Sequence, residues 1–88
     1  MDAKYILYLL KSCIFCRKAV DILELNNISY HAVYFDDNAT LLDQIKHAYS
    51  WNTVPIVFEN LDNYKYNLVG GYTELQLKLE SEKADDKE

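Results

Sequence analysis

Residues that interrupt secondary structure are scarce in this 88-residue chain. It has two glycines, the adjacent pair Gly70-Gly71, and one proline, Pro55. Pro55 precedes the apolar run Ile56-Val57-Phe58, so it can begin a strand, where its missing N–H is tolerated. The glycine pair follows a second run and breaks it. No repeat, linker or low-complexity segment precedes the charged C-terminal residues.

Long hydrophobic runs are also missing. The first run, residues 5–10, has about six residues, which is too short for the core of a signal peptide. It is also far below the roughly 20 residues that span a bilayer, and no longer run follows. We therefore expect a soluble, cytoplasmic protein. Structural disulfides are unusual in that compartment, where a close pair of cysteines is more often catalytic or metal-binding.

Positive charge is in the minority. Nine Lys and Arg stand against 14 Asp and Glu, for a net charge of −5, and no basic cluster is present to follow a phosphate backbone. This argues against a nucleic-acid-binding protein. Half of the residues are hydrophobic, enough for a small folded core. We predict one domain over residues 1–80, followed by a charged tail over residues 81–88.

Histidine is too scarce for a zinc site. A structural zinc ion needs a second pair of ligands beside a Cys-x-x-Cys pair. The chain offers only His31 and His47, the first in a predicted strand and the second in a predicted helix. We therefore expect no metal-ligating residues of this type, and both histidines are expected to pack or to lie at the surface.

The order of elements predicted by the hydrophobic pattern is βαβαββα. The strands are expected at 4–10, 28–35, 55–58 and 65–69, and the helices at 13–26, within 38–49 and from 73 onward. The first βαβ unit requires a parallel strand pair, and the later hairpin, with its turn at 59–64, adds antiparallel strands. The predicted fold is an α/β protein with a mixed four-stranded sheet and helices on both faces.

Helical spacing also predicts which side chains share a face of each helix. In the first helix these are Phe15, Ala19, Ile22 and Leu23. In the second they are Leu41, Ile45, Ala48 and Tyr49, with Leu42 beside them. In the last helix Leu75 and Leu79 share a face that excludes Leu77. Trp51, which lies outside these helices, is expected to pack in the core.

Two cysteines stand where the first strand ends and the first helix begins. Cys13 is expected at the helix N-terminus and Cys16 one turn further in. The partial positive charge of a helix N-terminus favours a thiolate, and Lys11, Arg17 and Lys18 lie close in sequence. A thiolate attacks a disulfide to form a mixed disulfide that a second thiol resolves. We predict that Cys13 attacks and Cys16 resolves; the alternative is two small apolar residues at a helix start.

Two further segments could bind a substrate beside the cysteines. A cis bond before Pro55 would leave the backbone N–H and C=O of Val54 to pair with an extended peptide or thiol substrate. The Gly70–Glu74 segment opens the last helix, where free N–H groups and the Thr73 hydroxyl could hold a carboxylate. Taken singly, the simpler readings are a strand start for the first segment and a turn with an N-cap for the second.

With these segments in this order, the chain resembles the glutaredoxin family from Lys4 to about Leu79. The matching motifs are SCIFC, NTVPIVF and LVGGYTEL. The resemblance implies a thioredoxin-like fold and glutathione-dependent reduction of glutathione mixed disulfides and protein disulfides through the CxxC centre. It also implies a role in electron transport and cell redox homeostasis.

The resemblance also implies how glutathione binds. Val54 would pair with the cysteinyl backbone of glutathione, Thr73 and Glu74 would hold its γ-glutamyl group, and Lys11 would face its glycyl carboxylate. The full implied set is Lys11, Phe15, Thr53, Val54, Pro55, Gly71, Tyr72, Thr73 and Glu74. Cys13 and Cys16 would be the catalytic pair.

Departures from the family pattern lie mainly between the cysteines. The family's usual centre is CPYC, and this chain has Ile14 and Phe15 in place of the proline and tyrosine. The redox potential therefore does not carry over. Family members without that proline sometimes hold a [2Fe–2S] cluster between two subunits, which makes a cluster carrier an alternative. The basic residue Lys11 stands two positions before the first cysteine rather than the usual three.

A second alternative is a glutaredoxin-like redoxin that is reduced by thioredoxin reductase and serves ribonucleotide reductase. The GGYTE segment argues against it, because in the family that segment contacts glutathione. A third is a binding module with an idle centre. The expected partners are glutathione and disulfide-containing or glutathionylated proteins, with ribonucleotide reductase among the candidates. The expected state is a monomer that binds neither nucleic acid nor membrane.

Overall fold

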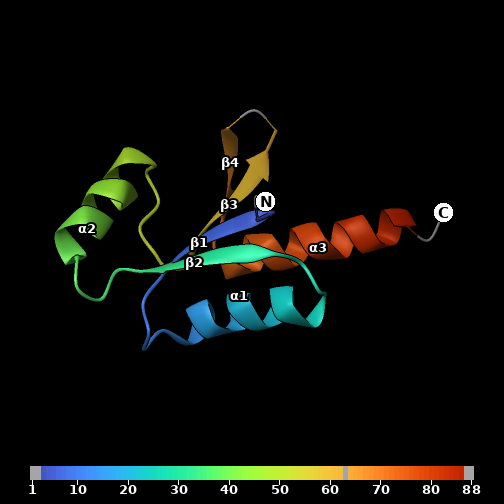
Figure 1. Cartoon of the computed structure of the whole chain (residues 1–88), viewed down its shortest axis with the longest axis horizontal. Helices are drawn as coiled ribbons and strands as arrows, with labels where there is room; N and C mark the ends of the chain where they lie inside the picture. Colours follow the sequence, from blue (N-terminus) through green and yellow to red (C-terminus); the bar gives the residue numbers. More distant parts are fainter. Residues whose placement is uncertain (1–2, 63, 87–88) are drawn as a thin grey trace.

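Figure 1 shows the computed structural model, which describes residues 3–62 and 64–86, with the backbone alone for 84–86. The elements follow the predicted order. They are β1 (Tyr5–Leu9), α1 (Ile14–Leu25), β2 (Tyr30–Tyr34), α2 (Ala39–Ala48), β3 (Ile56–Leu61), β4 (Lys65–Gly70) and α3 (Tyr72–Asp86). None of the helices within the described residues is long and apolar enough to cross a membrane.

A single mixed sheet of four strands organises the chain, with the order β2-β1-β3-β4. β1 pairs with β2 in parallel, and β3 is antiparallel to both β1 and β4. α1 and α3 pack on one face and α2 lies against the other, as Figure 1 shows. The predicted α/β architecture with helices on both faces is confirmed.

Alternation along β1 divides the core between the two faces of the sheet. Tyr5, Leu7 and Leu9 are fully buried against α1 and α3. Between them, Ile6 and Tyr8 face the α2 side, where they pack on Phe58 and its neighbours. Because successive side chains in a strand point to opposite faces, one apolar run supplies both layers.

The predicted helix faces are confirmed only in part. On α3, Leu75 and Leu79 are buried while Leu77 is exposed, as predicted. On α1, Phe15 does not join the buried face: its side chain is 52% exposed, and Cys16 occupies the buried position of the first turn. The ring of Phe15 lies instead 6.0 Å from that of Tyr72, at the start of α3.

On α2 the predicted stripe is confirmed in part, because Ile45 packs on the core and the Tyr49 ring contacts Phe58, while Leu41 does not join them. Leu42 is the buried residue, with Ile45 packed beside it, whereas Leu41 and Tyr49 are 40% and 50% exposed. Asn38 caps this helix by accepting a hydrogen bond from the Leu41 backbone N–H. The helix therefore touches the sheet along a narrow line.

The structure also differs from the sequence prediction at the hairpin turn and at the start of the C-terminal tail. The turn expected at residues 59–64 is shorter, because Glu59 to Leu61 continue β3 and Leu61 pairs with Lys65. α3 continues past residue 80, so the predicted start of the tail at residue 81 falls inside a helix. Residues 87–88 of that predicted tail lie outside the described residues.

Candidate redox site

Cys13 lies at the N-terminus of α1, in the N-cap position, with an extended backbone (φ −93°, ψ 121°). Its Sγ atom accepts a hydrogen bond from the Cys16 backbone N–H at 3.2 Å. The same thiol donates to the backbone carbonyl of Val54 at 3.7 Å. The cysteine sulfur therefore takes the place of the oxygen of a usual N-cap side chain, and it is partly exposed.

Cys16 is the inner thiol, and its side chain is only 2% exposed. Burial and the neighbouring Cys13 side chain raise the pKa of Cys16 to about 12, although the Leu10 backbone N–H, which donates to its Sγ at 3.5 Å, acts in the other direction. Neither cysteine forms a disulfide. The two sulfurs therefore differ sharply in access, and Cys16 remains a thiol at neutral pH.

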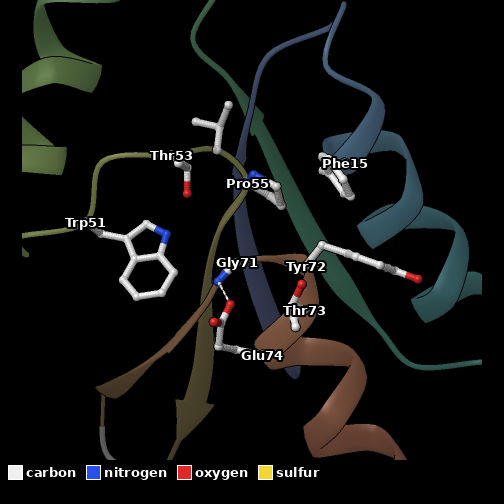
Figure 2. Close-up of a pocket in the computed structure, with 9 residues that line it drawn as sticks. Phe15, Trp51, Thr53, Pro55, Gly71, Tyr72, Thr73 and Glu74 are labelled. Atoms are coloured by element: carbon white, nitrogen blue, oxygen red, sulfur yellow. Dashed lines mark hydrogen bonds between the residues drawn. The ribbon is translucent and has the colours of Figure 1, made fainter.

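A cavity of about 300 Å³ (Figure 2) is lined in part by Val54, whose carbonyl oxygen accepts from the Cys13 thiol. Three segments that are distant in sequence meet there: the first turn of α1, the loop that enters β3, and the start of α3. The lining residues are Phe15, Trp51, Thr53, Val54, Pro55, Gly71, Tyr72, Thr73 and Glu74. Eight of the nine residues implied for glutathione binding are therefore brought together in one cavity, whose size is near the lower end for small-molecule sites.

Val54 connects the cavity to the thiol. Its side chain and backbone line the cavity, and its carbonyl oxygen is the acceptor of the Cys13 thiol. The Val54–Pro55 peptide bond is cis. An extended ligand that lies along Val54 is thus placed beside the Cys13 sulfur.

The α3 end of the cavity is shaped by the two glycines and Glu74. The Gly71 backbone N–H donates to the Glu74 side chain at 2.9 Å, the reciprocal half of a capping box (Figure 2). Gly70 has φ +130°, and a Cβ there would lie 2.7 Å from the Cγ of Glu74. Only glycine fits at residue 70. The space left by the missing side chain allows the Glu74 carboxylate to reach the Gly71 N–H at the start of α3.

Aromatic rings and a cation border the other side of the cavity. The rings of Phe15 and Tyr72 lie 6.0 Å apart, and the Lys18 ammonium is 5.1 Å from the Phe15 ring centre. The Tyr72 ring centre is 5.9 Å from the same ammonium. A positive charge over aromatic faces is favourable, so Lys18 is held near the cavity mouth.

Lys11 is the one implied binding residue that does not line this cavity. Its backbone N–H donates to the Asp36 carboxylate at 3.1 and 3.2 Å. It lines a separate cavity of about 350 Å³ with Leu10, Cys16, Arg17 and Tyr34. The structure thus sets Lys11 apart from the other eight.

Trp51 is a lining residue that the sequence interpretation missed. It was expected to pack in the core, and it does contact the apolar cluster around Phe58, but it also forms one wall of the cavity. Its Nε1 atom is buried and has no hydrogen-bond partner among the described residues. The sequence signal that could have indicated this role is the position of Trp51, two residues before the predicted binding residue Thr53. No cluster of three or more metal-ligating side chains occurs within residues 3–62 and 64–86.

A Cys-x-x-Cys pair that starts a helix after the first strand, on this mixed sheet, defines a thiol–disulfide oxidoreductase of the thioredoxin-like fold. The sequence profile of the Glutaredoxin family matches residues 5–62, about two thirds of the chain. The chain therefore belongs to the glutaredoxin family. The match ends before the Gly70–Glu74 segment, so that part of the site rests on the structure.

Solved structures support the same fold. The holo form of glutaredoxin C1 from Populus tremula × tremuloides has a TM-score of 0.76 at 23% identity, over 91% of this chain and 70% of that chain. The dithiolic glutaredoxin 2-C-Grx1 from Trypanosoma brucei brucei has a TM-score of 0.74 at 25% identity, over 96% and 84%. Glutaredoxin from Brucella melitensis has a TM-score of 0.71 at 20% identity, over 96% and 86%. A comparison with curated proteins gives no match.

Proposed function

We propose that this protein reduces glutathione mixed disulfides and protein disulfides, with glutathione as the reductant. The observation that supports this most directly is the cavity beside Cys13, which gathers Thr53, Val54 and the start of α3 around one space. The cavity offers an extended backbone edge, a helix N-terminus and apolar walls. Glutathione has a peptide backbone, carboxylates and a thiol to match these features.

Binding would begin at Val54. The 3.7 Å contact between its carbonyl oxygen and the Cys13 sulfur means that a cysteinyl residue paired with Val54 carries its own sulfur close to Cys13. The γ-glutamyl carboxylate would then lie at the N-terminus of α3, near the Thr73 hydroxyl, where helix N–H groups favour an anion. The Glu74 carboxylate would accept from the γ-glutamyl ammonium.

The reaction would proceed by thiol–disulfide exchange at Cys13. The Cys13 thiolate attacks the glutathione sulfur of a mixed disulfide, the new S–S bond forms, and the substrate thiolate leaves and takes up a proton. A second glutathione thiolate then attacks the glutathione sulfur held on Cys13. This releases oxidised glutathione and restores the Cys13 thiolate, so that electrons and protons balance.

Cys16 would act on protein disulfides. After Cys13 forms a mixed disulfide with a protein, the Cys16 thiol loses its proton and attacks the Cys13 sulfur, which releases the reduced protein and leaves a Cys13–Cys16 disulfide. Two glutathione molecules then reduce that disulfide. Burial, the main reason for the raised pKa of Cys16, disfavours its thiolate, so free glutathione would compete with this step.

A coupled assay with glutathione, its reductase and a small mixed disulfide tests the proposal. We expect turnover by the native sequence and by Cys16→Ser, and none by Cys13→Ser. Reduction of a protein disulfide should weaken in Cys16→Ser. Loss of both activities in Cys16→Ser, or turnover by Cys13→Ser, contradicts the assigned roles.

The two alternative functions, a redoxin reduced by thioredoxin reductase and a [2Fe–2S] carrier, stay predictions, and a separate measurement tests each of them. Electrons from thioredoxin reductase instead of glutathione would favour the redoxin that serves ribonucleotide reductase. Anaerobic reconstitution that gives charge-transfer absorption and a dimer would favour the [2Fe–2S] carrier. We propose a monomeric, cytoplasmic protein; sedimentation and fractionation of cells test these two points.

A further inference from the structure

Exposed apolar side chains continue along α1 away from the redox centre. Phe15, Ile22 and Leu25 lie on one side of the helix; Phe15 and Leu25 are 52% and 83% exposed, and Ile22 between them is half-buried against the core. Their spacing of seven and three residues is that of a single helical stripe. Such a large exposure of leucine on a short helix serves no packing purpose within the described part of the chain.

A second cavity follows this stripe. It measures about 320 Å³ and is lined by Lys18, Asp21, Ile22, Leu25 and Tyr72, which we call the α1 groove. Tyr72 lines both the α1 groove and the cavity beside Cys13. The two spaces are therefore neighbours that share one aromatic wall.

We propose that the α1 groove receives an apolar side chain of the polypeptide whose disulfide is reduced at Cys13. This inference rests on the proposed function, because it extends the same site to the protein part of the substrate. A polypeptide joined to Cys13 lies beside the first turn of α1, where Ile14 and Phe15 are 71% and 52% exposed, and the Phe15 ring lies 6.0 Å from that of Tyr72, which lines the α1 groove. The groove continues from there, so the partner is the substrate itself.

The lining determines the chemistry of the occupant. Ile22, Leu25 and the Tyr72 ring are apolar, and one lysine and one aspartate offset each other in charge. Lys18 is engaged over two aromatic rings, and Asp21 pairs with Arg17 at 3.5 Å. An uncharged apolar side chain such as leucine or phenylalanine fits this surface better than a charged one.

Helix geometry gives the position of that side chain in the substrate. Cys13 and Leu25 are separated by about 18 Å along α1, at roughly 1.5 Å per residue. An extended peptide covers about 3.3 Å per residue, so an apolar residue about five positions from the substrate cysteine reaches the far end of the groove.

Two pairs of synthetic peptides test the proposal. Each peptide contains one intramolecular disulfide, so that attack by Cys13 joins the peptide to the protein, and carries Leu or Asp five residues before its first cysteine in one pair and five residues after its second cysteine in the other. We expect kcat/KM to favour the Leu peptide about tenfold in at least one pair, which corresponds to about 1.4 kcal/mol of apolar burial. The measured quantity is the ratio of the two peptides within a pair.

Leu25 and Leu77 form a matched pair of variants. Leu77 is also an exposed leucine on a helix, at 60%, but it does not line the α1 groove. Leu25→Asp should bring the peptide ratio close to one, and Leu25→Ser, a second variant in case the charge disturbs folding, should lower it. Leu77→Asp should retain the ratio of the native sequence.

The outcomes separate the two proposals. A peptide ratio near one in the native sequence, or an equal ratio in Leu25→Asp and Leu77→Asp, overturns the proposal that the α1 groove binds the substrate. Turnover of a small mixed disulfide would still support the redox function in that case. Absence of turnover with the small mixed disulfide overturns the proposed function itself.

Discussion

The Cys13 sulfur lies 3.7 Å from the Val54 carbonyl oxygen, although 41 residues separate the two in sequence. The contact joins the N-terminus of α1 to the loop that enters β3. It fixes the reactive sulfur at the border of the cavity that Val54 helps to line. A ligand that replaces the thiol as the partner of Val54 is thereby placed in contact with the group that attacks it, which favours reaction by orientation.

The unequal exposure of the two thiols predicts selective alkylation. Under native conditions at pH 8, iodoacetamide should modify Cys13 and leave Cys16 unmodified, because Cys16 is 2% exposed and burial raises its pKa to about 12. Mass spectrometry of the intact protein should show one adduct. The same treatment in urea should give two, and two adducts under native conditions at comparable rates would refute the assignment of Cys16 as the inner thiol.

The raised pKa of Cys16 also predicts a loss of stability in alkali. Its folded pKa of about 12 lies above the ordinary value of 9.0, so the unfolded state releases this proton first. The unfolding free energy should therefore be independent of this group below about pH 9 and fall as the pH rises toward 12.

Chemical unfolding at pH 8 and at pH 11 measures this effect. Between them the native sequence should lose on the order of 1–2 kcal/mol more stability than Cys16→Ala does. Tyr30→Phe is a second variant for the same comparison. The hydrogen bond from Tyr30 to Glu24 raises the pKa of the Tyr30 phenol to about 12, so this group also contributes to the loss of stability in alkali. Equal losses in the native sequence and Cys16→Ala would contradict the proposed effect of burial.

The architecture was predictable because it follows from local signals. The apolar run of β1, the cysteine at a helix start and the single proline each specify a boundary, and these signals agree with one another. The burial of Leu75 and Leu79 follows in the same way from their spacing on one helix. Most of the cavity was predictable for another reason: the resemblance supplied the pairing of segments that spacing alone does not reveal.

The sequence predictions are wrong where tertiary contacts determine which side chains are buried. Phe15 fits the helical period of a core residue, yet the buried stripe of α1 runs through Cys16, Ala19 and Leu23, and the Phe15 ring faces Tyr72. On α2 the fully buried position is Leu42, which was expected only beside the stripe, and Leu41 is exposed. Trp51 looked like a core residue, and only the approach of Gly71 to its ring shows that it is also a wall of the cavity.

The two glycines predict opposite results for the same substitution. Gly70→Ala should lower the unfolding free energy by about 1–3 kcal/mol, because a side chain at φ +130° is strained and its Cβ would lie 2.7 Å from Glu74 Cγ. Gly71→Ala is the matched control: its nearest contact would be 3.4 Å, an ordinary separation. Urea unfolding of both variants measures the difference, and equal destabilisation would contradict the special geometry of residue 70.

Trp51 should report directly on occupancy of the cavity. It is the only tryptophan of the chain, and it lines the same space as Thr53 and Glu74. Titration of Cys13→Ser with S-methylglutathione, which binds without exchanging disulfides, should change the intensity or wavelength of its emission in a saturable manner. S-methylcysteine is the control ligand, because it lacks both the γ-glutamyl and the glycyl groups and should give a much weaker change. The Cys13→Ser, Glu74→Gln double variant should require more S-methylglutathione for the same change, since it loses the carboxylate that we propose accepts from the γ-glutamyl ammonium. Identical responses to the two ligands would show that the cavity does not recognise glutathione.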